Sequence, residues 1–131
     1  VTQAAAGVEN CLRLRVSGTK GTLEWMQEVP TQLAFKPLGA PAEMRTPNGP
    51  SSLPLARRAS RIVAGHPEGF HEGFANIYAD AAEAIAARRA GVDPDPLALV
   101  FPNAVDGVRG VAFVEAAIAS ALNDGAWTTV G

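Results

Sequence analysis

"LRLRVSGTKGTLEWMQ" spans residues 12–27, and this stretch decides which kind of fold the chain adopts. Residues 12–17 and 22–27 each alternate apolar and polar side chains, with the period of two that is typical of half-buried strands. The four residues between them, "GTKG", carry a glycine at each end and favour a tight turn. The stretch therefore predicts an antiparallel β-hairpin.

The chain beyond this hairpin first continues with strands and then changes its period. Residues 31–37 alternate again, and residues 42–47 form a weaker strand candidate between two prolines. A helix is predicted over residues 68–89, where apolar side chains recur at helical spacing: Phe70, Phe74, Ile77, Ala81 and Ile85. A second apolar stripe, from Val108 to about Asn123, predicts another long helix, and "AWTTV" (126–130) predicts a short final strand. We therefore expect an α+β domain in which two long helices pack on one face of a mainly antiparallel open sheet.

Both predicted helices carry signals at their starts. Pro67 suits the first position of the earlier helix, and the carboxylates of Glu68 and Glu72 suit the positive end of its dipole. Asn103 stands three residues before Asp106, which predicts a variant of the capping box at the start of the later helix.

The composition narrows the class of protein. A chain of 131 residues with 47% hydrophobic and 18% charged residues has the size and composition of one folded domain. Its net charge of −2 argues against a nucleic-acid partner, which requires a concentrated basic surface. A single cysteine, Cys11, excludes an internal disulfide and suits the cytoplasm. No apolar run approaches the roughly 18 residues needed to cross a bilayer, so we expect no membrane contact.

The first ten residues, "VTQAAAGVEN", have neither an initiator methionine nor the charged-then-apolar layout of a signal peptide. We interpret this opening, Val-Thr-Gln, as one that starts within a longer protein.

Three segments carry a resemblance to a known family. They are "LRLRVSGTKGTLEW" (12–25), "GHPEGFHEGFANIYADAAEAI" (65–85) and "FPNAVDGVRGVAFVEAAIASALNDGAW" (101–127), and they resemble the C-terminal part of the Gfo/Idh/MocA NAD(P)-dependent oxidoreductases. The resemblance implies a parent protein with an N-terminal Rossmann domain that binds NAD or NADP. It further implies that residues 1–131 are a C-terminal domain that binds a sugar, inositol or related polyol and forms homo-oligomers through its sheet.

Several elements of that family are absent from these residues. No G-x-G-x-x-G occurs, because Gly18 and Gly21 have the wrong spacing and lie in the predicted hairpin. The Glu-Lys-Pro segment and the D-x-x-x-H pair of the family are also missing. We therefore expect a single domain that is incomplete at its N-terminus, needs the missing Rossmann domain as its partner, binds no cofactor and is inactive alone. The alternative is a free-standing α+β binding or oligomerisation module without catalysis.

Both histidines of the chain, His66 and His71, lie beside Glu68 and Glu72. In the family that the chain resembles, G-H-P-E-G opens a long helix near the substrate pocket, so His66 and Glu68 are the predicted substrate-binding residues. The alternative is that His66 caps the helix and Glu68 complements its dipole. His71 lies five positions after His66, which does not place the two imidazoles on one helical face, and no third ligand clusters nearby. We therefore expect no metal, and His71 on the surface.

Four further residues have structural interpretations. Glu115 lies within the later apolar stripe and needs a partner, and an ion pair with Arg109 or with a strand arginine is predicted. Cys11 has no basic surroundings that would support a catalytic thiol. Trp25 and Trp127 are predicted to be core or interface aromatics.

Overall fold

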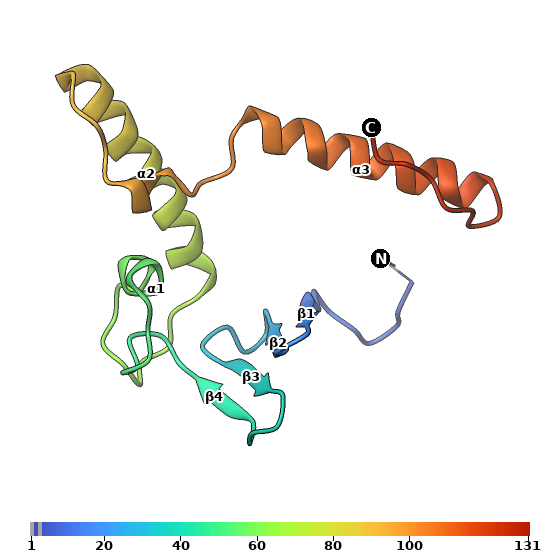
Figure 1. Cartoon of the computed structure of the whole chain (residues 1–131), viewed down its shortest axis with the longest axis horizontal. Coiled ribbons are helices and arrows are strands. Elements are labelled where there is room, and N and C mark those ends of the chain that lie inside the picture. Colours follow the sequence, from blue (N-terminus) through green and yellow to red (C-terminus); the bar gives the residue numbers. More distant parts are fainter. Residues whose placement is uncertain (1, 3) are drawn as a thin grey trace. The chain divides into compact units, whose positions relative to one another are not determined.

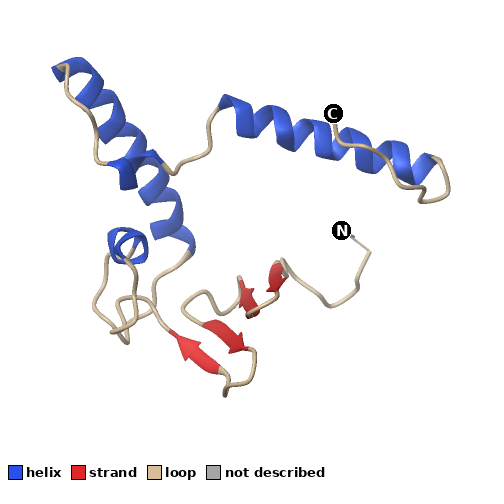
Figure 2. Ribbon diagram, in the orientation of Figure 1, coloured by secondary structure: helices blue, strands red, loops and turns tan. Residues whose placement is uncertain are grey.

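A computed structural model describes residue 2 and residues 4–131. The sequence interpretation of the opening Val-Thr-Gln rests partly on Val1 and Gln3, which lie outside the described residues. The strands and helices, in chain order, are β1 (Arg13–Gly18), β2 (Gly21–Met26), β3 (Leu33–Pro37), β4 (Glu43–Arg45), α1 (Pro54–Ala59), α2 (Phe70–Ala90), the 3-10 helix η1 (Pro96–Leu99) and α3 (Ala104–Leu122). They are shown along the chain in Figure 1 and by type in Figure 2.

The chain divides into two compact units, Val1–Ala79 and Asp80–Gly131. The first unit contains the four strands, α1 and the start of α2, and the second contains the rest of α2, η1 and α3. The prediction that residues 1–131 form a single domain stays a prediction.

The four strands form one sheet in the order β1-β2-β3-β4, and every neighbouring pair is antiparallel. The predicted hairpin is confirmed: β1 and β2 pair from Arg13 opposite Met26 to Gly18 opposite Gly21. Gly21 is needed because a Cβ at this position would lie 2.7 Å from the carbonyl oxygen of Lys36 on β3. A side chain there would push the third strand away from the hairpin.

The sheet has one apolar and one polar face. Cross-strand partners place these apolar side chains on a common face: Leu14, Val16, Leu23, Trp25, Leu33 and Phe35. β1 is an edge strand and is exposed along its whole length. Within residue 2 and residues 4–131, only Ala87 and Ala98 are buried hydrophobic residues. The apolar face therefore forms without being enclosed in a core of these residues.

The polar face carries an exposed ion pair. Lys36 Nζ lies 2.5 Å from Glu24 Oε2, and Glu24 is directly opposite Arg15 in the β1–β2 register. The hydrogen bond from Lys36 and the positive charges of Lys36 and Arg15 lower the pKa of the Glu24 carboxyl. Since both partners are in contact with solvent, the pair contributes little to stability.

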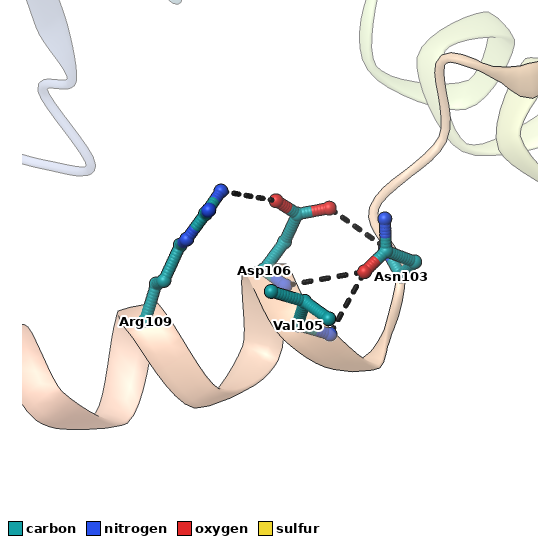
Figure 3. A network of polar contacts seen from close by, with 4 residues as sticks. All are labelled: Asn103, Val105, Asp106 and Arg109. Carbon is teal, nitrogen blue, oxygen red and sulfur yellow. Dashed lines mark hydrogen bonds and ion pairs between the residues drawn. The ribbon is translucent and has the colours of Figure 1, made fainter.

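The start of α3 is the capping box that the sequence predicts (Figure 3). Asn103 Oδ1 accepts hydrogen bonds from the backbone N–H groups of Val105, at 2.8 Å, and Asp106, at 3.3 Å. In return, Asp106 Oδ2 accepts one from the N–H of Asn103, at 3.0 Å. Arg109 Nη1 lies 3.8 Å from Asp106 Oδ1, and the predicted capping box is confirmed.

The predicted strand at residues 126–130 is wrong. After α3 the chain turns back: Gly125 N donates to Ser120 O, and Ser120 Oγ donates to Ala126 O. The tail then runs beside α3 (Figure 1). Residues of α3 and of the tail, Trp127 among them, line a shallow cavity of about 240 Å³. A strand needs a hydrogen-bonded neighbour, and the described residues of the second unit contain no other strand.

The predicted fold class is confirmed, because an antiparallel sheet and long helices occur in one chain. Among the described elements, extensive contacts join only neighbouring strands, so the packing of two long helices on one face of the sheet stays a prediction.

One apolar stretch differs from what the sequence led us to expect. By length and composition alone, Pro96–Leu122, which comprises η1, a four-residue linker and α3, is long and apolar enough to cross a membrane, with a mean hydropathy of 1.4. Small residues such as alanine raise this mean without forming a continuous run of large apolar side chains. The stretch also contains Asp106, Arg109 and Glu115, and charges inside a span are costly. The absence of membrane contact stays a prediction.

Candidate functional site: a groove in the first unit

A groove of about 1200 Å³ lies within the first unit. Trp25 and Leu33 line it from the apolar face of the sheet, and Phe70, Phe74 and Ile77 line it from α2. Polar groups also contribute to its lining: Asn10, Arg45, Glu68, Glu72 and Asn76. The groove thus combines a mainly apolar wall with a few carboxylate, amide and guanidinium groups, which is the usual make-up of a binding site.

The β2–β3 connection contacts the start of α2 at one point. The indole N–H of Trp25 donates to the carbonyl oxygen of Pro30 at 3.0 Å. A Cβ on Gly69 would lie 2.6 Å from Pro30 Cγ, so only glycine allows this approach. The second glycine of "GHPEG" is therefore a packing requirement of the groove.

Glu68 lies before α2, which begins at Phe70, and not within its first turn. Its Oε2 accepts hydrogen bonds from the backbone N–H groups of Arg61, at 2.8 Å, and Ile62, at 3.1 Å. The alternative in which Glu68 complements the helix dipole is therefore wrong, because this carboxylate accepts its hydrogen bonds from backbone N–H groups six to seven residues earlier. Pro67 is likewise outside the helix and does not occupy its first position.

Glu72 has the helix-start role instead. Its Oε2 accepts a hydrogen bond from the N–H of Gly69 at 2.8 Å. This bond, one from its own N–H and the nearby His71 together lower the pKa of the Glu72 carboxyl. An anion at the positive end of α2 is the arrangement that the dipole favours.

The two histidines are both exposed. His66 lies in a turn in which its N–H donates to Val63 O, and it is absent from the groove lining. Because α2 begins four residues later, the alternative in which His66 caps this helix is wrong. His71 packs edge-on against Phe70, with 5.9 Å between ring centroids, which confirms its predicted place on the surface. Among the described residues no group of three or more potential ligands is placed to hold a metal.

Two residues that hold the segment around residues 59–62 were not found from the sequence, and one of them, Asn76, lines the groove. Asn76 on α2 accepts from Arg61 Nε at 2.6 Å and donates to Ala59 O at 2.5 Å. Asn48 donates to Ile62 O at 2.6 Å. Asn48 precedes a glycine and has a positive φ of 54°, so its turn was detectable as Asn-Gly. Asn76 lies among apolar helical positions and has no comparable signal.

The remaining candidates have structural roles at most. Of the two partners predicted for Glu115, Arg109 is wrong, because Arg109 pairs with Asp106. The other, a strand arginine, lies in the first unit and stays a prediction. Cys11 is a free, half-buried thiol. Trp25 is half-buried beside the groove, as a core aromatic should be, whereas Trp127 is fully exposed.

The residues present do not fit a dinucleotide. A Rossmann site needs a parallel strand–turn–helix unit with closely spaced glycines, but the described sheet is antiparallel throughout. Gly18 and Gly21 bound the β1–β2 turn, as predicted.

Comparisons with known proteins show which proteins share this fold. No family model matches the chain. The uncharacterized oxidoreductase YfiI of Bacillus subtilis is 30% identical over 122 residues, which are 93% of this chain and 31% of that protein. An oxidoreductase from Sinorhizobium meliloti is 48% identical with a TM-score of 0.89, over 98% of this chain and 35% of the other. An inositol dehydrogenase homologue from Azotobacter vinelandii, solved with NADH and myo-inositol, is 36% identical with a TM-score of 0.81, over 95% of this chain and 33% of the other.

The chain thus spans about a third of the length of the relatives that it matches. It carries the fold of one part of the Gfo/Idh/MocA-like oxidoreductases, and the resemblance predicted from its sequence motifs is confirmed.

Proposed function

We propose that this chain is the substrate-binding and assembly part of an NAD(P)-dependent oxidoreductase that acts on a sugar, inositol or related polyol. The main support is its similarity, over 95% of its length, to the inositol dehydrogenase homologue that was solved with NADH and myo-inositol. In this proposal a Rossmann domain outside these residues binds NAD or NADP, and the parent enzyme works in the cytoplasm. The chain alone binds no cofactor and is inactive.

His66 and Glu68 are the proposed substrate contacts. Glu68 lines the groove, and both of its hydrogen bonds to the backbone use Oε2, which leaves Oε1 for a polyol hydroxyl. A carboxylate is a strong acceptor for such a donor. His66 is exposed and does not line the groove, so its assignment as a substrate contact is supported by the family resemblance of the "GHPEG" segment.

A titration with myo-inositol, followed by NMR, tests the substrate assignment. We expect shifts of amides that line the groove, and roughly tenfold weaker binding in His66→Ala and Glu68→Gln, since each loses a hydrogen-bonding or charged group. His71→Ala is the matched control, because His71 is exposed on α2 and its ring contacts that of Phe70. Unchanged amide positions at saturating myo-inositol, or equal weakening by His71→Ala, would contradict the assignment.

A fluorescence titration with NADH tests whether cofactor binding is confined to the Rossmann domain outside these residues. We expect no binding by these residues, since they contain no Gly-rich phosphate loop between a strand and a helix. Tight binding of NADH to the chain alone would overturn the proposal.

The mainly apolar character of the groove favours a second candidate, a free-standing binding or oligomerisation module without catalysis. The two candidates predict different coding sequences just before Val1. An open reading frame that encodes a Gly-rich strand–turn–helix and a Glu-Lys-Pro segment just before Val1 supports the enzyme part, and a start codon at that point supports the module.

A further inference from the structure

Three side chains from separate segments converge on residues 59–62, which are the last residue of α1 and the three after it and which we call the 59–62 turn. Glu68 Oε2 accepts the N–H groups of Arg61 and Ile62. Asn48 Nδ2 donates to the carbonyl oxygen of Ile62, and Asn76 bridges Ala59 O and Arg61 Nε. Both backbone groups of Ile62 are therefore satisfied by side chains, and not by a helix or a strand.

α1 depends on contacts of this kind for its position. It has six residues, none of them buried, and its N-cap Leu53 makes no side-chain capping bond. A helix this short is unstable in isolation. Yet Leu55, Ala56 and Ala59 of α1 line the groove, so the position of α1 sets the shape of that wall.

We propose that Glu68 is a positioning residue, which together with Asn48 and Asn76 holds the 59–62 turn and so fixes α1 as a wall of the groove. We call these three residues the 59–62 clamp. The clamp uses Oε2 of Glu68 and requires no ligand. Its importance for substrate binding rests on the proposed function, but its effect on the turn does not.

Amide hydrogen exchange measured by NMR on the 131-residue chain tests the clamp. In Glu68→Ala the amides of Arg61 and Ile62 lose their acceptor, and we expect them to exchange about tenfold faster. Glu68→Gln keeps an oxygen that accepts the same two N–H groups, so its rates should stay within about threefold of the parent's. The amide of Leu23 in the central strand β2 is the reference and should not change. Unchanged rates in Glu68→Ala, or equal acceleration in Glu68→Gln, would overturn the clamp.

A second variant keeps the test decisive if Glu68→Ala does not fold. Asn76→Ala frees Ala59 O and the guanidinium of Arg61, so trypsin should cleave after Arg61 several times faster. His71→Ala, on an exposed position of the same helix, is the control and should be cleaved at the parent's rate. Cleavage of Asn76→Ala at the parent's rate would itself overturn the clamp.

The two proposals fail in different ways. If the parent chain shows the expected exchange pattern but does not bind myo-inositol, the clamp stands and the proposed substrate is wrong. If Glu68→Gln keeps the slow exchange but binds myo-inositol more weakly, Glu68 has both roles, positioning through Oε2 and substrate contact through Oε1.

Discussion

Gly69 shows how one residue couples the sheet to α2 within the first unit. It follows Glu68, whose carboxylate holds the 59–62 turn, and it donates its own N–H to Glu72. Its missing side chain lets Pro30 approach, and Pro30 in turn accepts the indole N–H of Trp25. The "GHPEG" segment therefore joins three parts of the groove at one backbone position.

We predict that Gly69→Ala destabilises the chain by on the order of 1–3 kcal/mol, because its Cβ would overlap the ring of Pro30, which cannot rotate away. Gly73→Ala is the matched control. A Cβ there meets no atom within 4 Å, and alanine inside a helix should stabilise by roughly 0.5–1 kcal/mol. Urea unfolding followed by tryptophan fluorescence measures both, since Trp25 lies beside Pro30. Equal stability of Gly69→Ala and the parent would contradict this account of the packing.

Single residues were harder to predict than the segments that contain them. An acid at the start of α2 was expected, and Glu72 fills that role. Glu68 met the same local rule but is bound to Arg61 and Ile62 through a turn that local patterns do not reveal. Asn76 escaped notice for the same reason, because its partners lie 15 to 17 residues earlier.

Elements were predictable where their signals are local. Alternation over residues 12–17 and 22–27 placed β1 and β2 to within one residue of Arg13–Gly18 and Gly21–Met26. The prediction of a strand at "AWTTV" failed because a strand exists only with a neighbour, and pairing is a non-local property. The cap of α3 was predictable because the groups that form it belong to Asn103, Val105 and Asp106, which lie within four consecutive positions of the chain.

Because the cap of α3 is formed by residues close together in the chain, its contribution to stability can be tested by single substitutions. Asn103→Ala removes the acceptor for two N–H groups of the first turn and should lower the free energy of unfolding by about 1 kcal/mol. Asn103→Ser retains a capping oxygen and should stay within a few tenths of a kcal/mol of the parent. Urea unfolding followed by far-ultraviolet circular dichroism reports the loss of helix. If the serine variant were as unstable as the alanine variant, the side-chain cap would not be what holds this helix start.

For the molecule as a whole, the exposed apolar residues are the main energetic problem. Large apolar side chains are exposed on β1, on α2 and on α3, and Ala87 and Ala98 are the only buried hydrophobic residues of the described chain. Soluble monomers rarely leave contiguous apolar surface of this extent in contact with water. The relatives are about three times longer, so more polypeptide is available in them to cover equivalent faces.

We therefore predict that the chain alone forms a homodimer or larger oligomer through the apolar face of its sheet. Light scattering should give a mass of two or more chains over a roughly hundred-fold range of concentration. Val16→Lys should reduce that mass, because Val16 is 68% exposed on the apolar face and a buried lysine charge would oppose association. Ser17→Lys is the control: Ser17 is also exposed on β1 but points to the opposite face. A clean monomer throughout, or equal dissociation by both lysines, would show that this face of the sheet does not mediate assembly.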